Sequence, residues 1–143
     1  MAKVNHKLLV ASLSLGGIAA SFLPWSGFHR GSLPPGNLPD TVFYGYQVNG
    51  KYVAACFLGI LLLFLLTLFR KSMSKMVARL NALLALIALL VGLIDIVKTA
   101  SQGSMTGVVP FLREGPYVTT LIAFILFFIF VHIGINKKDE GNR

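Results

Sequence analysis

The stretch LNALLALIALLVGLIDIV, residues 80–97, decides the fold class of this chain. It carries one acid, Asp95, and no base. A helix of this length extends about 27 Å at about 1.5 Å per residue, which is close to the thickness of the hydrocarbon core of a bilayer. The stretch is therefore typical of a transmembrane helix rather than of a strand or a soluble helix.

Three further apolar stretches have similar length and composition, so the sequence predicts spans over residues 8–25, 52–69, 80–97 and 117–135. The composition agrees, because 13% of the residues are charged against about 25% in a soluble domain. It excludes a disordered chain, a disulfide scaffold and a typical soluble enzyme. We expect residues 1–143 to form one all-α membrane domain, a left-handed antiparallel four-helix transmembrane bundle.

The basic residues predict the orientation of this bundle. Four spans place both termini and the loop 70–79 on one side, and the loops 26–51 and 98–116 on the other. The first side carries nine lysines and arginines, the second four: Arg30, Lys51, Lys98 and Arg113. The positive-inside rule then places both termini in the cytoplasm. The net charge of +8 is explained by these membrane-flanking residues, and we expect no binding to nucleic acid.

The larger outer loop, 26–51, is expected to form a small cap. It contains the β-like run TVFYGYQV at 41–48, followed by Asn49-Gly50, which is a strong hairpin signal. The alternative is an extended loop lying on the membrane surface. The aromatic residues predicted at the outer interface, where amphipathic rings are enriched, are Trp25, Tyr44, Tyr46, Tyr52 and Tyr117.

Small and polar residues mark one face of two predicted helices. On the third span, Asn81, Ala85, Ala88 and Gly92 recur at spacings of three and four. The first span has a similar set in Ser14, Gly17 and Ser21. Such faces let helix backbones approach closely. We expect the first and third helices to pack tightly and the second and fourth to face lipid more. The alternative is a polar stripe that lines a solute path.

Asp95 is the one acid inside a predicted span. An ionisable residue at membrane depth is a functional hypothesis by default, and Lys98 lies one turn further along. One interpretation is an ion pair with Lys98 or a hydrogen bond to a first-span serine. The other is a proton or cation site.

The sequence offers no catalytic, cofactor or metal motif. The single cysteine, Cys56, cannot form an internal disulfide or a structural zinc site. His132 has no second candidate ligand close to it in sequence. No serine lies in a nucleophile-elbow context, and no pair of carboxylates is arranged for acid–base work. We therefore expect a non-enzymatic protein with no cofactor.

The corner Leu23-Pro24-Trp25, the Gly-rich loop after it, and Gly115-Pro116-Tyr117 before the last span form a recurring layout. It resembles small bacterial four-span membrane proteins whose first helix ends in Leu-Pro-Trp. This resemblance implies a location in the bacterial inner membrane and no particular activity.

The function expected from these features is that of an accessory or structural subunit. Its partners would be the lipid bilayer and other membrane proteins of a larger envelope complex, or a second copy of itself. The alternative is an oligomeric channel or small-solute transporter that uses the polar face of the third span.

Overall fold

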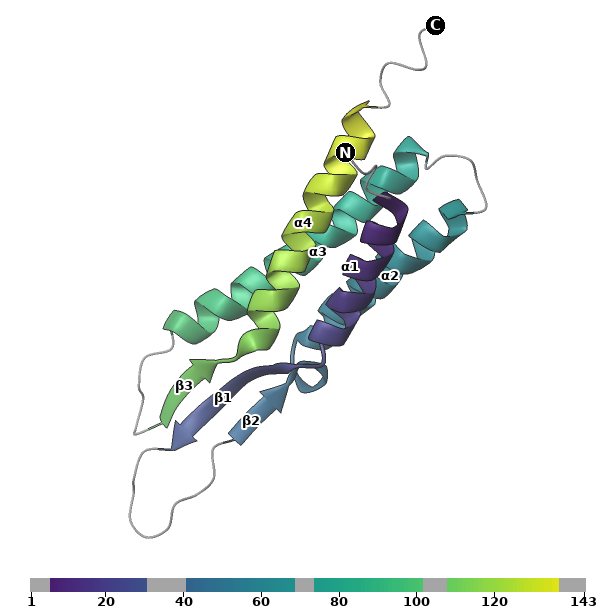
Figure 1. The fold of residues 1–143 in the computed structure, drawn as a ribbon. Coiled ribbons are helices and arrows are strands. Elements are labelled where there is room, and N and C mark those ends of the chain that lie inside the picture. The colour runs from purple at the N-terminus through teal and green to yellow at the C-terminus, as the bar shows by residue number, and fades with distance from the viewer. Residues whose placement is uncertain (1–5, 31–40, 69–73, 102–107, 137–143) are drawn as a thin grey trace, which may run out of the picture.

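The computed structural model describes residues 6–30, 41–68, 74–101 and 108–136 (Figure 1). Over these residues the chain forms four helices and a small sheet. In chain order the elements are α1 (His6–Ala20), β1 (Pro24–Arg30), β2 (Thr41–Tyr44), the 3-10 helix η1 (Gly45–Gln47), α2 (Gly50–Leu68), α3 (Lys75–Ser101), β3 (Val108–Leu112) and α4 (Glu114–Asn136).

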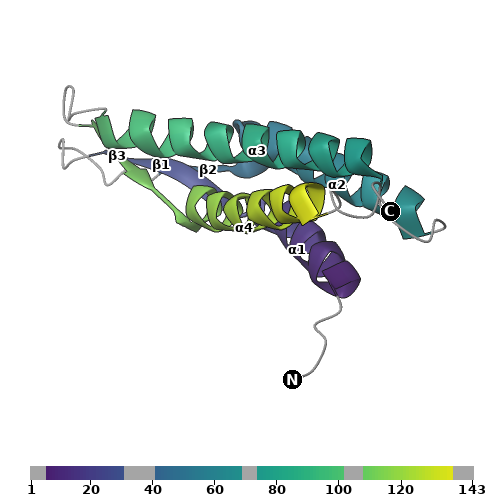
Figure 2. The ribbon, with the colours of Figure 1, turned by 90° about the horizontal axis from the view of Figure 1, so that it is seen from above.

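The helices run side by side and alternate in direction (Figure 1). Each packs against the next in chain order, and α1 also packs against α4. Figure 2 shows α4 lying between α3 and α1. The three strands meet at one end of the bundle, which we call the sheet end. The start of α1 and the end of α4 lie together at the opposite end, which we call the terminal end.

Three of these helices are long and apolar enough to cross a membrane: Gly50–Thr67, Lys75–Ser101 and Glu114–Ile135. The apolar part of α1, Lys7–Ala20, is shorter. Large apolar side chains cover the outside of the helices, and Leu62, Leu66 and Leu121 are each more than half exposed. A soluble protein rarely exposes such a continuous apolar surface. The chain is therefore a membrane protein with a mostly helical fold.

The prediction of a first span over 8–25 is wrong at its carboxyl end. Helix α1 ends at Ala20, and the N–H groups of Phe22 and Leu23 donate to the carbonyls of Ala19 and Ala20 in a tightened last turn. Pro24 then begins β1. Proline disfavours a helical conformation in the residue before it, so the helix cannot continue as apolar composition alone suggests.

The third helix is longer than its predicted span, because polar residues at both ends remain helical. It begins after Ser74, whose hydroxyl accepts a hydrogen bond from the Val77 N–H at 3.3 Å, as in an N-cap. It ends at Ser101, beyond the charged Lys98. The apolar composition of the sequence therefore predicts where this helix lies, but not the residues at which it begins and ends.

The sheet joins segments that are far apart in sequence. Its strand order is β2-β1-β3, and both pairings are antiparallel. The register shifts between Pro24 and Ser26, which leaves Trp25 at a bulge. A bulge re-aims the side chain that it carries, and Trp25 is buried inside the bundle end.

The predicted hairpin turn at Asn49-Gly50 is wrong. The strand ends at Tyr44, and η1 separates it from α2. The carbonyl of Asn49 accepts hydrogen bonds from the N–H groups of Tyr52 and Val53, at 3.0 and 3.3 Å, so this residue starts a helix. The run at 41–44 pairs instead with β1, and the second outer loop supplies β3, a strand that the sequence did not predict.

All four helices contribute to the core. Its largest fully buried side chains include Val10 of α1, Phe57 and Ile60 of α2, and Leu126 and Phe130 of α4. In the apolar segment of α2, 33% of the residues are buried within the protein, against 22% in the corresponding segments of α3 and α4. The expectation that the second helix faces lipid more than the third is therefore wrong, because α2 inserts its large apolar residues between α1 and α3.

Candidate functional site

A polar site lies at the sheet end, where the sheet meets the ends of the helices. A cavity of about 170 Å³ opens there between β1, the segment before α2, the end of α3 and the start of α4. The polar side chains that line it come from β1, from α3 and from the connection before α2: Trp25, Ser26, Asn49, Asp95, Lys98 and Thr99. The arrangement brings Asp95 and Lys98, the two residues singled out in the sequence, to one cavity.

Asp95 is held by a residue that the sequence did not indicate. The Nδ2 atom of Asn49 donates a hydrogen bond to Oδ1 of Asp95 at 2.5 Å. Asn49 lies at the start of α2 and Asp95 near the end of α3, so the bond links two helix ends across the cavity. Hydrogen bonds to charged groups are among the stronger ones in proteins. We call this pair the Asn49–Asp95 latch.

The suggested hydrogen bond between Asp95 and a first-span serine is not what the structure shows. Ser14 and Ser21 donate instead to carbonyls of their own helix, those of Val10 at 2.8 Å and Gly17 at 2.7 Å. A buried hydroxyl in an apolar environment satisfies itself in this way when no other acceptor is near. Within the described residues, these two serine hydroxyls therefore bond to their own backbone segment and not to the α3 carboxylate.

Trp25 fills the space beneath the sheet. Its side chain is 1% exposed. A Cβ atom added to Gly45 would lie 2.7 Å from its Nε1, and one added to Gly115 would lie 2.6 Å from the same atom. The indole is thus clamped between two glycine backbones. The sequence predicts this residue at the outer interface, and the structure buries its ring within the protein at the sheet end.

The buried indole N–H has no acceptor within the described segments. An unsatisfied buried donor costs about 1–3 kcal/mol. Packing of the large ring must offset this, and burial of an aromatic side chain contributes enough to do so. Trp25 therefore acts here as a wedge between the sheet and the helices.

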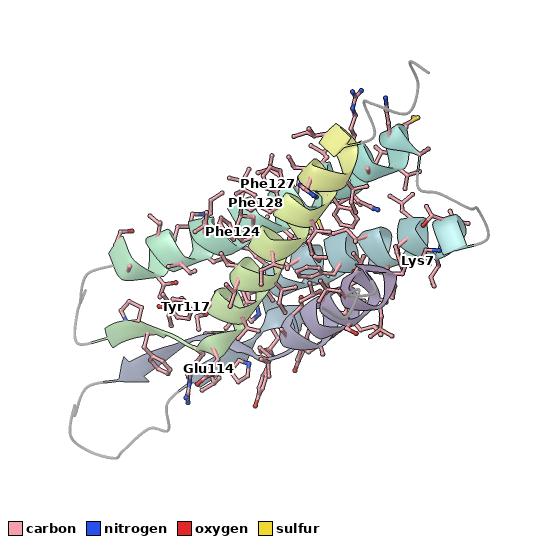
Figure 3. The ribbon with its side chains drawn as sticks, turned by 45° about the horizontal axis from the view of Figure 1, so that its top comes forward. Lys7, Glu114, Tyr117, Phe124, Phe127 and Phe128 are labelled. Atoms are coloured by element: carbon pink, nitrogen blue, oxygen red, sulfur yellow. The ribbon has the colours of Figure 1, made fainter. Side chains whose placement is uncertain are left out.

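The four tyrosines of the predicted outer interface do lie at the sheet end, and they are exposed. Tyr44, Tyr46, Tyr52 and Tyr117 each have between 42% and 57% of their surface free. The rings of Tyr44 and Tyr46 stack with centroids 6.0 Å apart. The ammonium group of Lys51 lies 5.3 Å from the Tyr52 ring centroid, within cation–π range. Figure 3 marks Tyr117 near the start of α4.

The seven small or polar residues singled out on the first and third spans are all buried. Ser14 and Gly17 lie in α1 and Ser21 directly follows it, whereas Asn81, Ala85, Ala88 and Gly92 lie in α3. A Cβ on Gly17 would lie 2.7 Å from the Phe57 ring of α2, and one on Gly92 would overlap the Thr120 hydroxyl of α4. Both faces therefore pack against α2 and α4.

Asn81 is unusual among these buried residues. Neither polar atom of its amide has a hydrogen-bond partner within the described part of the chain. The Thr120 hydroxyl of α4 is in the same situation. The Asn81 amide and the Thr120 hydroxyl therefore fill space between the helices but form no side-chain hydrogen bond within the described chain.

Among the described residues, no group of three or more His, Cys, Asp or Glu side chains could hold a metal ion. Cys56 is a free, half-buried thiol in α2, and His132 lies on the exposed side of α4 near the terminal end.

The residues missed by sequence reasoning are Asn49, Gly45 and Gly115. Each is a small residue that looks like ordinary turn punctuation, and each gains its role from a distant segment. The loop signals around them were visible, but nothing in those signals names Trp25 or Asp95 as the partner. Comparison of the chain with protein-family models, with curated proteins and with solved structures finds no match.

Proposed function

We propose that this protein is a non-enzymatic integral membrane protein that acts as an accessory subunit and binds another membrane protein at its sheet end. The observation that carries the proposal is the cap, by which we mean β1, β2, β3 and η1. This cap packs against the ends of the helices, and it exposes aromatic side chains.

Two backbone hydrogen bonds join the cap to the short connections after α1 and before α4. The Gly45 N–H donates to the carbonyl of Leu23, and the Arg113 N–H donates to the carbonyl of Trp25, both at 3.0 Å. The Trp25 side chain of β1 also packs directly against Gly115 at the start of α4, and the Asn49–Asp95 latch joins the ends of α2 and α3 beneath the cap. A surface that is ordered before binding loses less conformational entropy when a partner docks.

The exposed residues of the cap have the composition of a binding surface. Tyrosine and arginine are enriched among residues that dominate binding energy. Tyr44 and Tyr46 are exposed on the cap, and Arg113 is exposed directly after β3. Strand β2 pairs with β1 and forms an edge of the described sheet. An edge strand offers free backbone N–H and C=O groups that a partner strand can pair with.

The proposed topology has four spans, with α1 and its following turn forming the shortest. Both termini lie in the cytoplasm and the cap lies on the outer side of the bacterial inner membrane. The distribution of lysine and arginine supports this orientation. The cap then faces the compartment in which outer segments of other envelope proteins are available.

The transport alternative would use the polar face of α3 as a path. It draws less support from the geometry, because Asn81, Ala85 and Ala88 are buried against neighbouring helices. A path would require the bundle to open along this face. The accessory-subunit proposal uses the face as it stands.

A site-specific photocrosslinking experiment tests the partner surface. A benzophenone amino acid replaces Tyr46 on the cap or, as the control, Leu66, which is also exposed but lies on α2 far from the cap. We expect irradiation of intact cells to yield a discrete protein adduct from position 46 that additional Tyr44→Ala substitution weakens. Equal adducts from position 66, or none from position 46 or its neighbours on the cap, would contradict the proposal.

A further inference from the structure

A second cavity lies at the terminal end, on the other side of the molecule from the cap. It has a volume of about 410 Å³ and lies between the first turns of α3 and the last turns of α4. This volume is within the range of about 300–1,000 Å³ that is usual for ligand pockets. Lys75 and Arg79 line it from α3, and Phe130, Gly134 and Ile135 line it from α4. We call it the α3–α4 groove.

The groove is open where small residues line it. Near the sheet end, a Cβ on Gly92 would overlap Thr120, so α3 and α4 are in close contact there. Near the terminal end, a Cβ on Gly134 would meet nothing within 4 Å. Gly134 and the small Ala82 thus leave the space open rather than allowing close approach.

The charge of the groove is concentrated at its mouth. Lys75 and Arg79 are four residues apart on α3 and therefore lie on the same helix face. Both are exposed. The acids of the described segments, Asp95 and Glu114, belong to the other end of the bundle. The two cations thus form a positive site with no described carboxylate near it.

The remainder of the groove wall is apolar. Ala82, Phe130 and Ile135 provide it, and the outward faces of the same helices carry exposed leucine and phenylalanine side chains. Figure 3 shows Phe124, Phe127 and Phe128 along α4, and Phe124 and Phe128 are about half exposed. The groove therefore combines a cationic mouth with a hydrocarbon-like wall at the edge of a membrane-spanning helix pair.

We infer that the α3–α4 groove binds an anionic glycerophospholipid. Its phosphate is held between the Lys75 ammonium and the Arg79 guanidinium, and one acyl chain lies along Ala82 and Phe130. Basic pockets between transmembrane helices are suited to anionic headgroups, and guanidinium groups match phosphate oxygens in geometry. A soluble anion would leave the apolar wall unused, whereas a lipid satisfies both parts of the site.

The inference rests on membrane insertion and not on the proposed partner at the cap. Loss of the cap adducts would leave it untouched, and loss of lipid binding would leave the cap proposal untouched. Lys7 provides a matched control, because it is an exposed lysine at the same end of the bundle, on α1, and lies outside the groove (Figure 3).

The test measures lipid binding to the purified full-length protein in detergent by native mass spectrometry. The probes are phosphatidylglycerol and phosphatidylcholine with identical acyl chains. We expect phosphatidylglycerol to bind at least about tenfold more tightly, which corresponds to about 1.4 kcal/mol. Lys75→Gln and Arg79→Gln should each reduce this preference several-fold, while Lys7→Gln retains it.

Two further measurements separate the groove from general surface charge. Gly134→Leu fills the groove without changing the charge, and it should weaken phosphatidylglycerol binding while circular dichroism shows an unchanged helical fold. Glycerol phosphate, which has the headgroup charge but no acyl chain, should not compete at equal concentration. Equal binding of the two lipids, equal losses with Lys7→Gln, or effective competition by glycerol phosphate would each overturn the inference.

Discussion

Glycine residues at the sheet end occupy positions where the Cβ atom of a larger residue would meet neighbouring atoms at very short distance. A Cβ on Gly45 would overlap the Ser21 carbonyl oxygen and lie 2.7 Å from Trp25 Nε1. Gly50 faces the same point, since its Cβ would lie 2.7 Å from the Ser21 oxygen. These contacts involve backbone atoms, which cannot rotate away as a flexible side chain can. The close packing of the Trp25 wedge depends on these glycines.

We predict that Gly45→Ala destabilises the protein by about 1–3 kcal/mol, the usual range for overpacking of a well-packed site. The matched control is Gly134→Ala, where the added methyl group meets open space. This control should be neutral or slightly stabilising, since alanine favours a helix over glycine by up to about 1 kcal/mol. Thermal unfolding of both variants in detergent measures the difference, and equal midpoints would contradict the proposed clamp.

Asp95 illustrates how far a single residue can be interpreted from sequence. Its position within an apolar stretch distinguishes it from the other acids, and Lys98 lies one helical turn further along the sequence. The Asn49 amide that binds its carboxylate is 46 residues distant. Proximity of this kind depends on how α2 and α3 are placed, which local patterns do not specify.

At the scale of elements, the polar face of α3 could serve either for packing against other helices or as a path for a solute. Asn81, Ala85, Ala88 and Gly92 form one buried face between α2 and α4. The sequence predicted the existence of this face from its spacing. It did not predict which helices cover the face, because a small-residue stripe specifies close approach without specifying a partner.

Cysteine accessibility distinguishes packing from a solute path along this face. In a Cys56→Ala background, Ala85→Cys and Ala88→Cys should remain unreactive toward a water-soluble maleimide in native membranes and should react after denaturation. Ser101→Cys, at an exposed position at the end of α3, serves as the reactive control. Labelling of positions 85 and 88 in the native state would favour the transport alternative.

The outer loops show where element prediction failed and why. The β-like run before Asn49 was recognisable, but its expected partner, the segment after Gly50, belongs to α2. Strand pairing is decided by the nearest available backbone edge. Here that edge belongs to β1, which begins at Pro24 after α1 has ended. Strand β3 from the second outer loop pairs with the other edge of β1. Strand β1 therefore pairs with β2 from the same outer loop on one edge and with β3 from the other outer loop on its second edge.

At the scale of the whole molecule, the two ends of the bundle differ in chemistry. The sheet end carries the cap, the described acids and the exposed tyrosines. The terminal end carries the α3–α4 groove with Lys75 and Arg79. This polarity is consistent with a protein that contacts a partner on one side of the membrane and lipid headgroups on the other.

The proposed topology makes a prediction for the whole molecule that depends on α1 crossing the membrane. In a Cys56→Ala background, Tyr46→Cys on the cap should react with a membrane-impermeant maleimide in intact cells, whereas Lys7→Cys should react only after the membrane is opened. Helix α1 is the shortest apolar helix, so this pair tests the weakest span. Labelling of both positions in intact cells would mean that α1 does not cross.

The sequence by itself determined the membrane class, the approximate positions of the three long helices and the small-residue face of α3. These are properties of contiguous residues, and hydropathy and helical periodicity report them directly. Only the tertiary structure decided the three-stranded cap, the burial of Trp25 between two glycines, the Asn49–Asp95 latch and the opening at Gly134. Each of these depends on distances between segments far apart in the chain. Such distances are set by the packing of whole helices and by competition among backbone partners.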